Sequence, residues 1–401
     1  MKKFTKATLA VALAIFSSTA AMGETKELQD QQQTALNVAD LQGQSLEVPP
    51  IEADAQQDST QKFLDKKWVK ELTSRIQLHG YAQGGYSYSQ HDGKGQNSFE
   101  LKRVLFWANA QITDRWSFLF MHDFSSVVQE FYTDFRITKN KALTVRLGQF
   151  KNGLSLENPL SPTSMEAIDV YSEGVTYLSG CGSDPLLGVQ YGRDLGLALY
   201  GETNNSKLRY ELEVMNGQGI NKKDGNRFKD VIARIEYRPV KGLNLVATGQ
   251  IGQGHALSSS AYMVLKTANT LVNKGDNYKR NRWTVGFDYR SKDFNLHGEY
   301  LEGYDGKTVS RGGYITGSVP LGRPEIELIG SYDYFNYNTS LGLDQHKGII
   351  GLQYWFYKKC RVQLQYVYKN AYLTGAASDP ASKFVHDSHH ALMCQVQVRF
   401  N

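Results

Sequence analysis

The chain ends on ALMCQVQVRFN, residues 391–401, in which apolar and polar side chains alternate. The even-numbered residues 392–400 are apolar, whereas the odd-numbered positions include Gln395, Gln397 and Arg399. Because successive side chains of a strand point to opposite faces, this segment predicts a strand with one apolar and one polar face. Such a strand fits the surface of a soluble sheet. It equally fits the last strand of a membrane barrel, which must pair with the first.

The same period of two runs from Arg75 to the end of the chain and predicts sixteen strands. Most of them have ten residues or more, whereas strands of soluble proteins have about five or six. A tilted strand that crosses a bilayer needs about 9–11 residues, so the length favours a membrane barrel. The predicted strands cover residues 75–90, 97–112, 115–125, 127–138, 143–151, 193–203, 206–216, 228–238, 243–252, 282–291, 294–304, 310–319, 324–336, 346–357, 360–370 and 388–400.

The connections between these strands alternate in length. Short turns such as PVKG, PLGR and KK fall at one end, and HDGKGQ, NYNTSLGLD and connections of 41 residues (152–192) and 30 residues (252–281) fall at the other. Outer-membrane barrels have short periplasmic turns and long extracellular loops. We therefore predict an all-β fold, a transmembrane antiparallel barrel of about 16 strands, with an exported soluble β-sandwich as the alternative. The 41-residue connection is expected to narrow the lumen, because long loops without strong secondary structure are usually functional.

The N-terminal segment precedes the predicted barrel of residues 75–401. Residues 1–23 combine a basic start, an apolar run and small residues before Gly23, which predicts a signal peptide. Residues 24–74 are polar and Gln-rich, which predicts a periplasmic tail with a short helix over 58–74. The formal charge of +5 comes from 45 basic and 40 acidic residues, a balance that argues against nucleic acid as a partner.

Four segments carry a resemblance to a known family. VRLGQFKNGLSLENPLS (145–161), LKRVLFWANAQI (101–112), GRDLGLALYGE (192–202) and YELEVMNGQGINKKDGN (210–226) resemble porins of the phosphate-selective porin O and P family, in the form found in Bacteroidota. The resemblance implies a Gram-negative outer-membrane location, a sixteen-stranded barrel, a homotrimer, and a third loop folded into the pore. It also implies a preference for phosphate.

Basic residues on the predicted inner face are the candidate pore-lining and anion-attracting side chains. Lys151 and Arg146 flank GQF where the 152–192 connection begins, and a basic pair there would draw anions into a narrow channel. The alternative is a solvated wall without selectivity, because the same face carries many carboxylates, among them Glu130, Glu213 and Glu299. The candidate set is Arg103, Arg146, Lys151, Arg209, Arg234, Arg290, Arg311, Arg361, Lys369 and Arg399.

Catalytic and metal sites are not expected. His389 and His390 of HDSHH fall on opposite faces of a strand, so they cannot bind one metal ion together. No G-x-S-x-G motif is present. We therefore predict no enzyme activity, no cofactor and no metal, and a porin that passes small hydrophilic solutes by diffusion, with an anion or phosphate preference. Its partners would be membrane lipid, the solutes and its own copies. The alternative is a plugged barrel that acts as a binding receptor or adhesin.

Overall fold

The computed structural model describes residues 74–91, 94–184, 186–258, 272–374 and 384–400. The chain divides into Met1–Ser74 and Arg75–Asn401, and the second unit is described below. The predicted signal peptide, and the predicted tail and helix except for residue 74, lie outside the described residues. Within the described ranges, no helix has the length and apolar character needed to cross a membrane.

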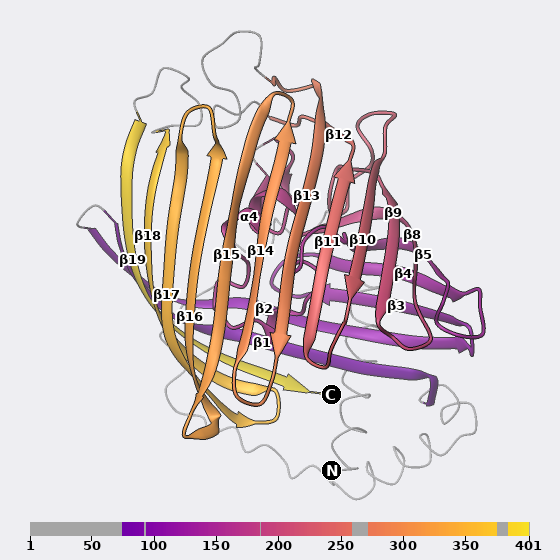
Figure 1. The fold of residues 1–401 in the computed structure, drawn as a ribbon, viewed down its shortest axis with the longest axis horizontal. Coiled ribbons are helices and arrows are strands. Elements are labelled where there is room, and N and C mark those ends of the chain that lie inside the picture. Colours follow the sequence, from indigo (N-terminus) through magenta and orange to yellow (C-terminus); the bar gives the residue numbers. More distant parts are fainter. Residues whose placement is uncertain (1–73, 92–93, 185, 259–271, 375–383, 401) are drawn as a thin grey trace, which may run out of the picture. The chain divides into compact units, whose positions relative to one another are not determined.

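Sixteen antiparallel strands close into a barrel, as the sequence predicts (Figure 1). One of the sixteen is interrupted at Gly252, so β11 and β12 are its two parts and both pair with β13. The strands are β1 (Ile76–His91), β2 (Lys94–Thr113), β3 (Trp116–Asp123), β4 (Val128–Arg136), β5 (Thr144–Lys151), β8 (Arg193–Glu202), β9 (Leu208–Met215), β10 (Asp230–Tyr237), β11 (Leu243–Ile251) with β12 (Gln253–His255), β13 (Asn277–Arg290), β14 (Asn295–Asp305), β15 (Thr308–Leu321), β16 (Arg323–Asn338), β17 (Leu343–Tyr357), β18 (Cys360–Thr374) and β19 (Phe384–Phe400).

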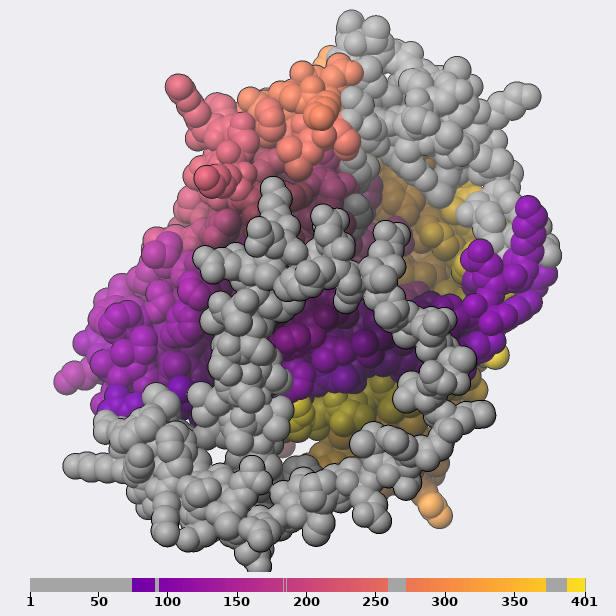
Figure 2. Space-filling model, turned by 180° about the vertical axis from the view of Figure 1, so that it is seen from behind, coloured from indigo at the N-terminus to yellow at the C-terminus, as the bar shows by residue number. Residues whose placement is uncertain are grey.

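The closing seam joins the first strand to the last. β1 and β19 pair from Gly80 opposite Phe400 to His91 opposite His389. Figure 2 shows the yellow C-terminal strands lying along the indigo N-terminal ones. The backbones of β1 and β19 come close together at Gly85, where a Cβ atom would lie only 1.8 Å from the backbone oxygen of Cys394, so the absence of a side chain at this position allows the two strands to pair. Residues 391–400, with their alternating apolar and polar side chains, therefore belong to the strand that closes the barrel.

The barrel carries its apolar side chains on the outside and its polar ones on the inside. Trp283 and Val396 are 40% and 44% exposed, whereas the inward-facing Gln363 and Gln397 are fully buried. A soluble sandwich would have the opposite arrangement, with the apolar face inside. This outer face is the one expected to meet hydrocarbon, as in outer-membrane barrels.

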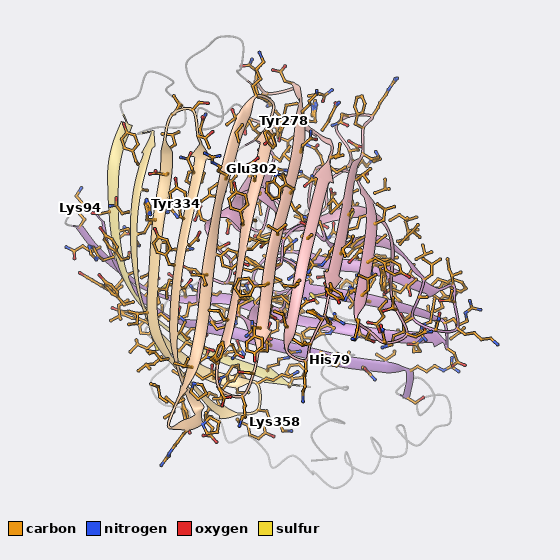
Figure 3. The ribbon with its side chains drawn as sticks, viewed as in Figure 1. His79, Lys94, Tyr278, Glu302, Tyr334 and Lys358 are labelled. Atoms are coloured by element: carbon orange, nitrogen blue, oxygen red, sulfur yellow. The ribbon has the colours of Figure 1, made fainter. Side chains whose placement is uncertain are left out.

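Long connections lie at one end of the wall and short turns at the other, called here the long-loop end and the short-turn end. Tyr278, near the 256–276 connection, and Lys358, in the β17–β18 turn, mark the two ends (Figure 3). Two predicted long loops are wrong. Pairing of β1 with β2 extends to His91 and Lys94 within HDGKGQ, and pairing of β16 with β17 extends to Asn338 and Leu343 within NYNTSLGLD, so the strands satisfy more of the backbone than the sequence pattern suggests.

The connection between β5 and β8, called here loop 3, contains the 3₁₀ helix η1 (Pro162–Ser164), α4 (Glu173–Leu178), β6 (Ser183–Asp184) and β7 (Gly188–Val189). Its side chains pack on inward-facing residues of the wall, so the loop lies inside the barrel. The side chain of Ser172 caps α4 by accepting a hydrogen bond from the amide of Val175. Next to it, Gly174 faces Phe335 and Leu301.

Candidate functional site

Carboxylates of the wall hold the first part of loop 3. The amide of Gly153 donates to Oε2 of Glu213 at 3.0 Å, and the amide of Leu156 donates to Oε1 of Glu299 at 2.8 Å. Both carboxylates lie on the inner face, on β9 and β14. Buried backbone N–H groups need such partners. These two acidic residues therefore hold loop 3 in place. This role explains part of the mixture of acidic and basic residues that the sequence shows on the inner face of the barrel.

The middle of loop 3 lies against β18. Nη2 of Arg361 donates to the carbonyl of Met165 at 2.6 Å, and the Nε2 atoms of Gln363 and Gln365 both donate to the carbonyl of Glu166 at 2.7 Å. Arg361 is 1% exposed. It is one of the predicted pore-lining residues, and it lies beneath the loop rather than open to the lumen.

Lys151, the last residue of β5, is bonded to the loop that follows it. Its Nζ donates to the carbonyls of Asn158 and Leu160 at 2.8 and 2.7 Å and to the hydroxyl of Tyr171 at 3.2 Å. The ammonium group has three N–H donors. All three are used within the protein, so Lys151 anchors loop 3 while its side chain borders a lumenal cavity.

The carboxylate of Glu173 fixes the start of α4. It accepts hydrogen bonds from the hydroxyl of Tyr337 at 2.5 Å and from Nε2 of Gln345 at 3.0 Å. Burial alone would raise the pKa of Glu173, but the ammonium groups of Lys347 and Lys369 and the two hydrogen bonds outweigh it and lower the pKa. Glu173 is therefore an ionised anchor inside the barrel.

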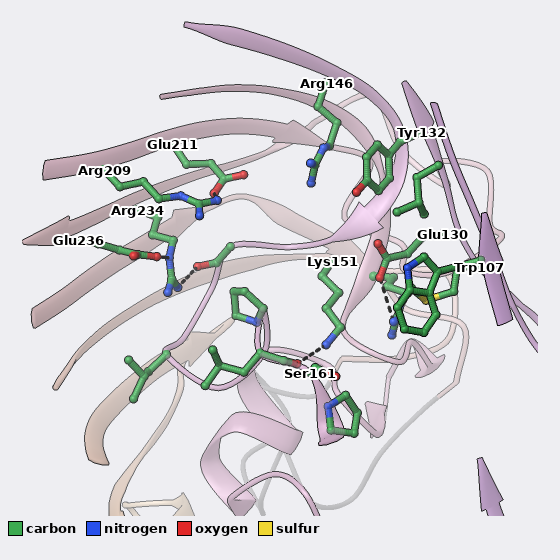
Figure 4. Close-up of a pocket in the computed structure, with 18 of the residues that line it drawn as sticks. Trp107, Glu130, Tyr132, Arg146, Lys151, Ser161, Arg209, Glu211, Arg234 and Glu236 are labelled. Carbon is green, nitrogen blue, oxygen red and sulfur yellow. Dashed lines mark hydrogen bonds and ion pairs between the residues drawn. The ribbon is translucent and has the colours of Figure 1, made fainter. Parts of the chain in front are cut away.

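A cavity of about 530 Å³ lies on the short-turn side of loop 3 and is called here the short-turn cavity. Figure 4 shows Arg209, Glu211, Arg234 and Glu236 along one side of it and Trp107 on the other. Seven basic and four acidic side chains border it: Arg146, Lys151, Arg193, Arg209, Arg234, Arg238 and Arg399, with Glu130, Glu211, Glu236 and Asp288.

A second cavity, of about 420 Å³, lies on the long-loop side of loop 3 and is called here the long-loop cavity. Lys347, Lys369 and His389 stand opposite one another on three neighbouring strands and border it. Arg103 borders the same space. Lys347 is paired with Asp333 at 3.3 Å, and Asp169 and Glu173 also border this cavity, so basic and acidic groups lie on both sides of loop 3.

Several predicted cations are neutralised by carboxylates. Arg146 Nε lies 2.8 Å from Oδ1 of Asp134, and Arg234 Nε lies 2.8 Å from Oε1 of Glu236. Arg290 pairs with Asp288 at 2.7 Å and also with Glu166 of loop 3. Arg209 has a longer separation of 3.7 Å from Glu211. All of these pairs lie on the strands β4–β5 and β9–β13 or bridge them to loop 3.

The other cations of the predicted set on the inner face have no carboxylate partner within 4.0 Å among the described residues. Three of the strands that carry them, β2, β18 and β19, lie on either side of β1 and make up the seam. An unpaired charge beside low-dielectric walls produces a strong local field. Positive potential therefore concentrates on this part of the lumen. The predicted inner-face cations without a carboxylate partner are Arg103, Lys151, Arg361, Lys369 and Arg399.

The predicted inward position of Arg311 is wrong. In β15 the inward residues alternate with exposed ones, and Arg311 falls on the exposed face together with Ile315 and Val319. It stands opposite Glu302 of β14, whose carboxylate accepts from Tyr300 on the outer face. Gly312 and Gly313 have no side chain, so the sequence does not show at these positions which face of the strand is apolar and which is polar.

Three important residues were missed from the sequence. Trp107 lies two and four residues from Leu105 and Arg103 on the inner face of β2, so the period of two could have identified it. Lys347 falls in the predicted strand 346–357 and needed only its face to be assigned. Arg193 pairs with Glu130 at 3.0 Å. That contact is between distant segments, and no sequence signal shows it.

The described residues contain no group of three or more His, Cys, Asp or Glu side chains arranged to hold a metal ion. His389 lies on the inner face, and His390 lies on the outer face, where its Nδ1 is 2.6 Å from the hydroxyl of Tyr366. The predicted opposite orientation of these two histidines is therefore confirmed. The side chain of His386 lies outside the described residues.

Comparison with known proteins yields similar structures but no similar sequences. No family model matches the chain, and no curated protein matches it. Among solved structures, the anion-selective porin from Comamonas acidovorans superposes with a TM-score of 0.58 at 13% identity, over 81% of this chain and 99% of that chain. The fold is a porin barrel.

Two further structures show the same likeness. OprB of Pseudomonas putida gives a TM-score of 0.56 at 9% identity, over 83% of this chain and 96% of that one. OmpF of Salmonella typhi, in complex with daunomycin, gives 0.55 at 12% identity, over 80% of this chain and 97% of that one. At identities this low, the TM-scores establish the shared fold alone.

Proposed function

We propose that this chain is an outer-membrane porin through which small hydrophilic solutes pass by diffusion, with a preference for anions. The observation that carries the proposal is the distribution of unpaired charge in the lumen. Arg103, Lys369 and Arg399 have no carboxylate partner within 4.0 Å among the described residues, and they border the two cavities on either side of loop 3. Wall carboxylates such as Glu213 and Glu299 are occupied by amides of the loop.

The mixed composition of the lumen does not contradict an anion preference. Acidic side chains that are paired with arginines or bonded to backbone amides add little repulsion for a passing anion, because their charge is locally compensated. Unpaired cations act at full strength in a narrow space between low-dielectric walls. The balance along the seam therefore favours anions over cations.

The remaining parts of the proposal rest on the sequence. Residues 1–23 would be the signal peptide, 24–74 a periplasmic tail and 75–401 the outer-membrane barrel. The segments around GQFK support a distant relationship to the phosphate-selective porin O and P family, with phosphate as one of the anions and a homotrimer as the assembly. We propose no enzymatic activity.

Conductance and ion selectivity of the purified protein in a planar bilayer test this proposal. We expect stable open steps and, in a gradient of KCl, a reversal potential with the sign of anion preference. A reversal potential of cation sign would refute the anion preference but not the proposal that the protein is a diffusion channel. Addition of phosphate on one side should reduce the chloride current if phosphate enters the same path.

A plugged barrel that binds a ligand is the second candidate. Its support is the extent of loop 3, which is bonded to β9, β14 and β18 and separates the two cavities. The bond between Lys151, which borders one cavity, and Tyr171, which borders the other, crosses this partition. Absence of open steps in correctly folded protein would favour this candidate.

A further inference from the structure

The short-turn cavity has an apolar side that a water-filled barrel does not require. Inner faces of porins are polar, yet Leu105, Trp107, Leu119 and Met121 point inward from β2 and β3 and border this cavity. Trp107 stands directly opposite Met121, and Leu119 stands opposite Tyr132 of β4. Neighbouring strands thus form a continuous apolar surface, called here the apolar stripe, which consists of Leu105, Trp107, Leu119, Met121 and Tyr132.

Packing accounts for only part of the apolar stripe: Leu105 is buried, and Tyr132 packs against a cluster that includes Leu154 of loop 3, whereas the other three side chains are not covered in this way. Elsewhere in the lumen, inward apolar residues are covered, as where Ile168 of the loop packs on Ile349 and Val367. Trp107, Leu119 and Met121 belong to no buried cluster, and each of them keeps part of its surface exposed to the cavity. Apolar surface left open in a concave space is typical of ligand sites.

Cationic groups accompany the apolar stripe. The guanidinium carbon of Arg399 lies 5.8 Å from the ring centroid of Trp107. Nη1 of Arg399 donates a hydrogen bond to the hydroxyl of Thr163, and its Nε has no hydrogen-bond partner in the described part of the chain. Across the cavity, Nε of Arg209 also has no hydrogen-bond partner among the described residues, while Nη2 of the same side chain lies 3.7 Å from Glu211. Buried donors of this kind are rare unless a ligand or water satisfies them.

We propose that the short-turn cavity is a binding site for organic anions that carry a flat apolar ring. The ring would lie on Trp107 and the other side chains of the apolar stripe, and the carboxylate, phosphate or sulfonate would accept hydrogen bonds from Arg399 or Arg209. A volume of about 530 Å³ is within the range of ordinary small-molecule sites. This inference rests on the proposed function, because it names the class of solute that the pore retains during passage.

Binding and conductance are measured separately with three probes of matched chemistry. Benzoate has a ring and a charge, acetate has the charge alone, and benzyl alcohol has the ring alone. Isothermal titration of the detergent-solubilised barrel should give the tightest binding for benzoate, at least about tenfold tighter than for either control, because stacking and a charged hydrogen bond each contribute. In a bilayer, benzoate should interrupt the open current for longer than acetate does.

Two variants connect the site to its residues. Trp107→Ala should weaken benzoate binding by about five- to tenfold and leave acetate unchanged, and Arg399→Gln should weaken both anions. Trp283→Ala is the matched control, because Trp283 lies on the outer face and should have no effect. Heat-dependent mobility on a gel verifies that each variant is folded.

The outcomes separate this inference from the porin proposal. Equal affinity for benzoate and acetate, or unchanged benzoate binding in Trp107→Ala, would overturn the site even if the channel conducts. A barrel without open steps that still binds benzoate through Trp107 would overturn the diffusion pore and support the site.

Discussion

Nζ of Lys151 donates a 2.7 Å hydrogen bond to the backbone carbonyl of Leu160, nine residues further along the chain. This bond closes the start of loop 3 onto the strand from which it leaves. The sequence alone suggested an anion-attracting role for Lys151, at the point where the loop enters the lumen. Its three bonds give it a structural role as well, and the two roles can be separated by experiment.

Replacement of Lys151 by Met should loosen loop 3 more than it changes ion selectivity. Two loop carbonyls and the Tyr171 hydroxyl would lose their donor, which costs about 1–3 kcal/mol for each buried group left unsatisfied. We expect larger fluctuations of the single-channel current and faster proteolysis within 152–192. Lys292→Met is the control, because the Lys292 side chain is 91% exposed. A quiet channel with a large change of reversal potential would mean that Lys151 acts mainly on ions.

Reversal of one lumenal charge should change ion selectivity, whereas reversal of an outer charge should not. Lys369 borders the long-loop cavity and has no carboxylate within 4.0 Å among the described residues, so Lys369→Glu should move the reversal potential towards cations. Arg311→Glu makes the same change of charge on the outer face and should leave the potential unchanged. An equal effect of both variants would contradict the assignment of the two faces.

The attachment of α4 should fail in acid. The pKa of Glu173 is lowered in the folded protein, so its carboxylate contributes stability that is fully present above the ordinary value of about 4.3 and is lost as the pH falls through the lowered pKa. We expect current fluctuations to appear only below about pH 4. Glu173→Gln, which lacks the charge, should show them at pH 7. Identical pH profiles of the two proteins would exclude Glu173 as the group that titrates.

Closure of the barrel should depend on Gly85. A Cβ at this position would lie 1.8 Å from the carbonyl oxygen of Cys394, so Gly85→Ala forces β1 and β19 apart and should reduce the yield of folded barrel. Gly330→Ala is the matched control, because no atom of the described residues lies within 4 Å of a Cβ there. The fraction of protein with heat-dependent gel mobility measures both. A normal yield for Gly85→Ala would show that the seam adjusts easily.

The buried pair of Arg282 and Asp305 should be sensitive to removal of one partner. Their side chains are 0% and 1% exposed, and Nη2 lies 2.9 Å from Oδ1. Asp305→Asn should lower the free energy of unfolding by about 3–5 kcal/mol, because it leaves a buried guanidinium without its counter-charge. The exposed pair of Lys292 and Asp293, 91% and 72% exposed, provides the control: Asp293→Asn should cost less than about 1 kcal/mol in the same urea titration.

Alternation predicted all sixteen strands and divided the side chains of each into two faces, and the lengths of strands and connections then indicated that the polar face lines the lumen, with exceptions where glycine interrupts the pattern. Arg311 is the clearest failure, since Gly312 and Gly313 next to it have no side chain to indicate a face. Strand ends were the weaker part. Polar residues such as those of NYNTSLGLD look like a loop, yet their backbone groups pair across β16 and β17.

The sequence by itself determined the barrel, because strands of ten residues or more and connections that alternate in length fit a membrane barrel better than a soluble sandwich. It also determined most of the predicted cations on the inner face, although Arg311 lies outside and Lys347 and Arg193 were missed. Only the tertiary structure decided which of them are neutralised. Arg290 meets Glu166, and Lys151 meets the carbonyl of Leu160, because loop 3 folds back across the barrel. The field in the lumen depends on distances between segments far apart in the chain, and no local pattern records those distances.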